Sequence, residues 1–211
     1  EGAPDEGEAI RLMLAALELT GAIVTMDPGN ASKATASATI EAGADYVITV
    51  KSNRKRFHTA LRQVFEATLA GNASPMKVKH HQTRGKGHGR HEVRDVWVAP
   101  ASALGDMARY WPGLRTVVMV RSTRVRSNGR VQSWVHYYAS SLPTTVRLHA
   151  RVIREHWGVE NGLHHILDVS FHEYTRNDRS AFPQEALRES EKLIVGMEKG
   201  ASPLPMDTPL V

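Results

Sequence analysis

Apolar positions recur along the chain with two different spacings, and the change between them predicts the order of helices and strands. In residues 8–19 the apolar positions lie three or four apart, which is typical of an amphipathic helix. The runs 22–26 (AIVTM) and 46–51 (YVITVK) are short and apolar, as buried strands are, and the Ala-rich segment 31–42 between them is predicted to be helical. Because a strand–helix–strand order favours parallel pairing, residues 8–75 are expected to form an α/β unit.

After a further helix predicted at 57–70, apolar and polar residues begin to alternate, which indicates strands. One hairpin is predicted at 76–98 around a glycine-rich turn. A second is predicted at 115–141 around the pair Asn128-Gly129, which is a strong hairpin signal. Residues 76–142 are therefore expected to form a β-rich insertion between the α/β unit and a long helix.

The long helix is predicted from Arg151 to Glu173, and it carries a carboxylate on its apolar side. Glu160 falls on the apolar stripe, which has steps of three and four. A glutamate that faces a core is costly unless it is paired or bound to a cation. Two explanations stay open, a salt bridge, for example to Arg154, and a metal site. The stripe consists of Ile153, Trp157, Leu163 and Leu167.

The C-terminal region is expected to contain a second helix and a tail. The long helix and a following helix at 184–197 together make up residues 143–197, and the proline-containing tail 198–211 is expected to be disordered. The chain begins with Glu1 rather than Met and enters a helix almost at once. We therefore expect it to be a piece of a longer chain, truncated at its N-terminus.

Charge and composition narrow the classes of partner and of chemistry. A net charge of +5 and a pI near 9.6 favour a polyanionic partner, usually nucleic acid, although basic residues that merely solvate a surface remain an alternative. The absence of cysteine excludes disulfides, thiolate metal sites and a cysteine nucleophile, and it fits the reducing cytoplasm. No apolar run reaches 18 residues, so no membrane span is expected.

Asp27 stands where the first predicted strand ends, directly before Pro28-Gly29. The carboxyl end of a buried strand is a usual place for a catalytic group in α/β folds. An aspartate that simply initiates the turn is the alternative.

Two cationic clusters suit contacts with phosphate groups. The glycines of the second cluster, in the turn GKGHGRH, would let a backbone approach a ligand closely, although the turn lacks the spacing of a phosphate-binding P-loop. A histidine metal site is a further alternative, but the histidine spacings fit no standard zinc site. The first cluster consists of Lys51, Asn53, Arg54, Lys55 and Arg56, and the second of Lys86, His88 and Arg90.

Six segments, in order along the chain, resemble the bacterial insertion-sequence transposases of the DDE superfamily, in particular the ISAs-one-type branch. The resemblance spans about residues 10–185. The segments are GAIVTMD (21–27), GADYVITVKSN (43–53), KGHGRHEVRDVWV (86–98), WPGLRTVVMV (111–120), YYASSLP (137–143) and HWGVENGLHHILDVSFHE (156–173).

The resemblance implies an RNase H-like catalytic core with a β-rich insertion before the last catalytic helix. It also implies DNA transposition, by metal-dependent phosphodiester cleavage and strand transfer at insertion-sequence ends. Asp27 matches the second aspartate of the family and Glu160 matches its glutamate, so both are expected to be catalytic and to bind two Mg²⁺ or Mn²⁺ ions. His156, Trp157 and Asn161 lie in the family motif around Glu160 and are expected to support the site or to contact DNA, and Arg154 is a further candidate DNA contact.

The chain also departs from the family pattern. The strand that carries the first aspartate of the family has no counterpart here, so the RNase H-like core is expected to be incomplete and the chain to be an inactive fragment. The alternative is a non-catalytic, DNA-binding relic or a partner of a full-length transposase. The expected partner is double-stranded DNA at insertion-sequence ends, and self-association as a homo-oligomer is a further expectation.

Overall fold

The computed structural model describes residues 6–71, 77–87, 90–170 and 193–196. In the last long helix the side chains are described up to Gly158. Within the described chain, no helix is both long enough and apolar enough to cross a membrane.

The described part of the chain has a mixed α/β fold, in which seven strands form one sheet in the order β3-β4-β5-β6-β2-β1-β7. The strands are β1 (Ile23–Met26), β2 (Asp45–Val50), β3 (Lys79–Gly87), β4 (Arg90–Pro100), β5 (Thr116–Arg126), β6 (Val131–Ser140) and β7 (Leu193–Gly196). The helices are α1 (Glu6–Ala16), α2 (Lys33–Glu41), α3 (Lys55–Leu69) and α4 (Val146–Ser170), with the 3-10 segments η1 (Ser52–Arg54) and η2 (Ala101–Tyr110).

The first two strands pair in parallel, with Ile23 opposite Asp45, and this confirms the pairing expected from the strand–helix–strand pattern. The two predicted hairpins are also present, as β3–β4 and β5–β6. They do not form a sheet of their own. β6 pairs antiparallel with β2, with Val47 opposite Ser140, so the sheet is continuous across the boundary expected near residue 76.

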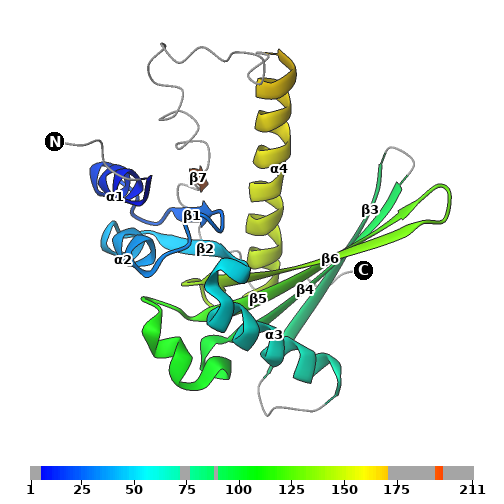
Figure 1. Ribbon diagram of the computed structural model, residues 1–211, viewed down its shortest axis with the longest axis horizontal. Coiled ribbons are helices and arrows are strands. Elements are labelled where there is room, and N and C mark those ends of the chain that lie inside the picture. The colour runs from blue at the N-terminus through cyan, green and yellow to red at the C-terminus, as the bar shows by residue number, and fades with distance from the viewer. Residues whose placement is uncertain (1–5, 72–76, 88–89, 171–192, 197–211) are drawn as a thin grey trace, which may run out of the picture.

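Alternation along the strands builds an apolar surface on each face of the sheet. On one face, side chains such as Ile48, Met119 and Tyr137 pack with those of α1, α2 and α3. On the other face, side chains such as Val118 and Tyr138 form a second core with the first turns of α4. Figure 1 shows α4 standing beside the sheet, while the outer halves of β3–β6 reach away from the body as a twisted arm.

The prediction of a helix at 184–197 is wrong for residues 193–196, which form strand β7. β7 pairs antiparallel with β1, with Val24 opposite Val195. An unpaired strand edge exposes backbone donors and acceptors, so pairing along β1 favours the extended form of the run Leu-Ile-Val over a helix. The remainder of that expected helix and the tail 198–211 lie outside the described residues.

Candidate functional site

Asp27 lies against the buried ring of His156, a residue of α4 that is distant from Asp27 in the sequence. Alternation along β1 turns Thr25 and Asp27 toward α4, and His156 on α4 reaches both of them. Its Nδ1 lies 3.0 Å from the Thr25 hydroxyl, and its Nε2 lies 3.4 Å from Asp27 Oδ1. The His156 side chain is 5% exposed and that of Asp27 is 37% exposed. The carboxylate is therefore accessible while its neighbour is held in the core.

The hydroxyl of Thr25 contacts the His156 ring at Nδ1. With the ring proton on Nε2, Nδ1 accepts a hydrogen bond from the Thr25 O–H, and the N–H of Nε2 is directed toward the Asp27 carboxylate. The 3.4 Å separation is longer than a strong hydrogen bond, so the contact between His156 and Asp27 is weak.

Glu160 occupies the helical position four residues after His156, about one turn or 6 Å further along α4. Residues four apart lie on the same side of a helix, so this backbone position follows His156 on the face that turns toward β1. The side chains of Glu160 and Asn161 lie outside the described residues, and their predicted roles stay predictions. Among the side chains that are described, no three acidic or histidine groups gather as metal ligands.

The loop that carries Asp27 is tied to the end of the neighbouring strand by two members of the first cationic cluster. Asn53 donates from Nδ2 to the Pro28 carbonyl at 2.8 Å, and Arg54 donates from Nε to the Ala31 carbonyl at 2.9 Å. Both residues were predicted to bind DNA. In this structure they position the backbone around Asp27, and contact with phosphate is a separate, untested role.

The rest of the first cluster is exposed at the start of α3. Lys55 and Arg56 line a groove of about 960 Å³ together with Lys33. The stacked rings of Phe57 and Trp111, with centroids 4.9 Å apart, form part of its wall. Lys51 is exposed just before η1, outside the groove lining. Asp27 follows the carboxyl end of β1, and the groove residues Lys55 and Arg56 follow that of β2. Because β1 and β2 are parallel, these two ends lie at the same edge of the sheet.

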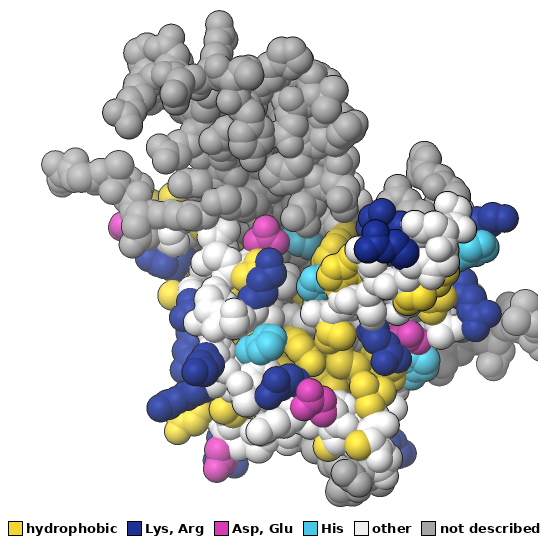
Figure 2. Space-filling model, turned by 45° about the vertical axis from the view of Figure 1, so that its right-hand side comes forward, with side chains coloured by type: hydrophobic (Ala, Val, Ile, Leu, Met, Phe, Trp, Pro, Cys, Tyr) yellow, Lys and Arg dark blue, Asp and Glu magenta, His cyan; other side chains and the backbone are white. Residues whose placement is uncertain are grey.

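The second cationic cluster lies on the arm, away from Asp27 (Figure 1). Lys86 is exposed on β3, and Arg90 is the first residue of β4. His88 and the side chain of Arg90 lie outside the described residues. Figure 2 shows further lysine and arginine side chains around the arm. The acidic residue Glu92 on the arm already has arginine partners. Glu92 Oε1 lies 2.9 Å from Arg94 and 3.6 Å from Arg124.

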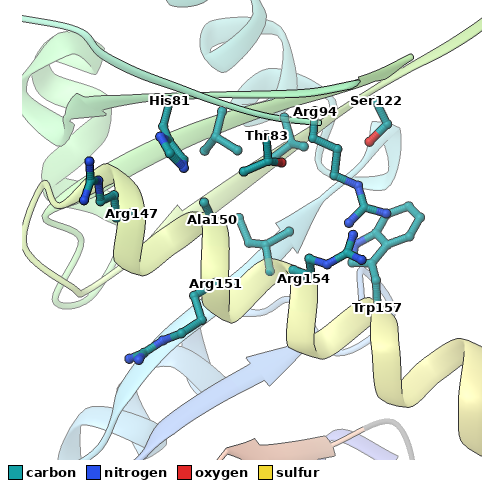
Figure 3. A pocket seen from close by; sticks show the side chains of 12 residues that line it. His81, Thr83, Arg94, Ser122, Arg147, Ala150, Arg151, Arg154 and Trp157 are labelled. Carbon is teal, nitrogen blue, oxygen red and sulfur yellow. The ribbon is translucent and has the colours of Figure 1, made fainter. Parts of the chain in front are cut away.

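A cleft of about 220 Å³ separates the first turns of α4 from the face of strands β3–β5 (Figure 3). Arg154 and Trp157, both predicted to contact DNA, line this cleft. The Trp157 indole N–H donates to the Tyr138 hydroxyl at 3.1 Å, and the ring meets His136 edge-on at a centroid distance of 4.7 Å. Burial lowers the pKa of His136, and the nearby Lys51 ammonium lowers it further. The full lining is His81, Thr83, Arg94, Val96, Val120, Ser122, Arg147, Ala150, Arg151, Ile153, Arg154 and Trp157.

The structure thus brings some predicted residues together and separates others. Asp27 and His156 meet, and Arg154 and Trp157 share a cleft, whereas Lys86 lies on the arm. Sequence reasoning missed Thr25, although its position two residues before Asp27 on a strand predicts a shared face. It also missed Arg147 and Arg151, whose spacing of four and then three to Arg154 would have predicted one helical stripe. For Arg94 the sequence carries no such signal.

Comparison with known proteins relates the chain to bacterial proteins named as transposases. It is 28% identical over 200 residues to Putative transposase YncI of Escherichia coli O157:H7, covering 93% of this chain and 50% of that protein. It is 32% identical over 173 residues to H repeat-associated putative transposase YhhI of Escherichia coli strain K12, covering 80% and 45%. Putative protein YbfL of the same strain is 33% identical over 173 residues, with the same coverage.

The chain therefore spans about half the length of the curated relatives it matches. No family model matches the chain, and no solved structure matches it.

Proposed function

We propose that the chain is part of a DDE-superfamily transposase of the ISAs-one type, that it holds an incomplete RNase H-like core, and that it is inactive by itself. The proposed activity is metal-dependent phosphodiester cleavage and strand transfer at insertion-sequence ends, carried out by the whole protein. The proposed partner is double-stranded DNA, met in the bacterial cytoplasm. The relatives named as transposases support this class of function.

The observation that carries the proposal is the contact between Asp27 and His156. It joins the carboxyl end of β1 to the segment HWGVE of α4, and these are the two segments whose acids the family resemblance implicates. A carboxylate that is 37% exposed, at a strand end, can still take a cation. Mg²⁺ and Mn²⁺ prefer oxygen ligands, so a pair of carboxylates fits them.

Each residue of this site would have a separate task. Asp27 and Glu160 would hold the divalent ions, His156 would orient the Asp27 carboxylate, and Thr25 would fix the His156 ring. When bound, the ions supply activation of the attacking oxygen and stabilisation of the leaving oxygen. A carboxylate whose orientation is set by a neighbouring side chain, as His156 would do for Asp27, suits this chemistry because a metal site requires a fixed ligand geometry.

Metal binding tests the proposal. Mn²⁺ titration followed by electron paramagnetic resonance should show saturable binding to the wild-type chain and weaker binding, by about tenfold or more, to Asp27→Asn and Glu160→Gln. Asp106→Asn is the matched control, because that acid is 89% exposed on η2, on the other face of the sheet. Equal Mn²⁺ affinity in all four proteins would contradict the proposal.

A non-catalytic, DNA-binding relic is the second candidate. The observation that favours it is the placement of exposed cations on the arm and around the α4 cleft, where they need no metal to bind DNA. DNA binding that is the same with and without Mg²⁺, together with no Mn²⁺ binding, would select this candidate.

A further inference from the structure

The cleft between α4 and strands β3–β5 concentrates positive charge without acidic side chains in its wall. Four arginines and a histidine line it, and the described lining contains no Asp or Glu. The remainder of the wall is small, hydroxyl-bearing or apolar. A hollow of this composition is suited to an anion, because arginine guanidinium groups bind phosphate oxygens in pairs of parallel hydrogen bonds.

The helix side of the cleft presents its arginines at regular intervals. Arg147, Arg151 and Arg154 are spaced by four and then three residues along α4. Figure 3 shows the Arg151 side chain extending away from strands β3–β5, so Arg147 and Arg154 are the arginines that α4 offers to a ligand in the cleft. The Cα atoms of Arg151 and Arg154 rise by about 6 Å and about 10.5 Å along the helix axis from that of Arg147. The apolar side chains of Ala150 and Ile153 pack α4 onto the sheet and so hold the stripe at the cleft.

The strand wall and the helix wall of the cleft each direct a guanidinium group toward the same end of the cleft. Figure 3 shows the side chains of Arg94, from β4, and Arg154, from α4, directed toward the same end of the cleft, where Trp157 lies. Arg94 has one carboxylate partner, Glu92, at 2.9 Å, and Glu92 is shared with Arg124 at 3.6 Å. Converging guanidinium groups repel each other unless an anion lies between them. An anion here would gain contacts from both walls.

The shape favours a polymer over a single small anion. The arginine stripe extends over about 10 Å, which is the axial rise of about three phosphates of one DNA strand. His156, which contacts Asp27, stands on the same helix between the cleft residues Arg154 and Trp157. The groove at the start of α3 is less suited, since Asp106 lies in its wall and the Lys33 ammonium sits 5.2 Å over the Tyr110 ring.

We propose that this cleft binds successive phosphate groups of one DNA strand and directs that strand along α4 toward Asp27. The choice of DNA rests on the proposed function. The binding of phosphates in the cleft rests on Arg94, Arg147 and Arg154 and needs no metal.

The test is the salt dependence of binding to a 20-base-pair DNA duplex, measured by fluorescence anisotropy in EDTA. For duplex DNA, the slope of log affinity against log salt is about −0.9 per phosphate contacted. Arg147→Gln with Arg154→Gln should make the slope shallower by about 1.8. Between about 50 and 200 mM salt, the wild-type chain should then lose about tenfold more affinity than this double variant.

The matched control removes the same charge from the other face. Arg62 and Arg109 are exposed on α3 and η2, in weak surface ion pairs with Glu66 and Asp106. Arg62→Gln with Arg109→Gln should leave the slope within about 0.5 of wild type, since neither side chain lines the cleft. If the cleft variant does not give the wild-type circular dichroism spectrum, Arg94→Gln replaces it, with an expected loss of about 0.9.

Three results would overturn the inference. They are an unchanged slope in the cleft variant, an equal loss in the control, or a loss seen with a 20-nucleotide RNA but not with the DNA duplex. The proposed function fails separately. Absent Mn²⁺ binding together with a normal cleft effect would reject the metal site and keep the cleft.

Discussion

Thr25→Val removes the hydroxyl that holds the His156 ring while keeping a branched side chain of similar shape. Thr25 is 6% exposed and His156 is 5% exposed, so water cannot easily replace the lost partner of Nδ1. A net hydrogen bond contributes about 1 kcal/mol, and a buried polar atom left without a partner costs about 1–3 kcal/mol. We therefore expect Thr25→Val to lower the free energy of unfolding by about 1–3 kcal/mol.

Urea unfolding followed by circular dichroism measures this free energy, and a double-mutant cycle assigns it to the pair. In a His156→Leu background there is no ring nitrogen to leave unsatisfied, so Thr25→Val should cost at least about 0.5 kcal/mol less than in the wild-type chain. Costs that add within error would show that the Thr25–His156 hydrogen bond does not stabilise the fold, and the reasoning about His156 would be refuted.

Two further predictions concern stability. Burial lowers the pKa of His149 below its ordinary value, despite the opposing hydrogen bond to the Thr145 carbonyl, so the folded state favours the neutral ring. The free energy of unfolding should therefore be retained above about pH 6.5 and fall as the pH drops toward the folded-state pKa. His149→Gln should make this fall smaller, as measured by urea midpoints between about pH 5 and 8. Gly113 has φ +65°, and a Cβ there would lie 2.9 Å from Ile40 Cδ1, so Gly113→Ala should lower the unfolding free energy by about 1–2 kcal/mol or more. Gly129→Ala, at φ +76° with open space around it, should cost less, and equal losses in thermal melts would contradict the clash.

The local pattern predicted the elements of this fold well because most of them are set by short-range periodicity. The pairing of β1 with β2 follows from one short crossover. The pairing of β6 with β2 joins residues more than ninety positions apart, such as Val47 and Ser140, and no local pattern carries that information. The same limit explains β7. The run Leu193-Ile194-Val195 suits a helix or a strand, and the choice depends on the edge of β1.

The sequence predicted the part of the candidate site that lies at a strand end or in the family motif. Asp27 was found from its place at the end of a strand, and His156 from the motif around Glu160. The cationic cluster was harder to interpret, because a basic or amide side chain near a strand end can bind phosphate or donate a hydrogen bond to a backbone carbonyl. Asn53 and Arg54 do the second in this structure. Arg94 joins the cleft through packing of α4 on the sheet, which residue types alone do not reveal.

The most direct test of the central claim is the location of bound Mn²⁺, read from the line broadening of histidine ring protons in nuclear magnetic resonance. An ion held by Asp27 and Glu160 would lie beside His156, so substoichiometric Mn²⁺ should broaden the His156 signals first and leave those of His80 and His58 sharp. His156→Gln identifies the signals, and Asp27→Asn should abolish the selectivity. Preferential broadening of His80, which lies 2.9 Å from Asp95, would place the ion beside Asp95 on the inner half of the β3–β4 hairpin and contradict the account.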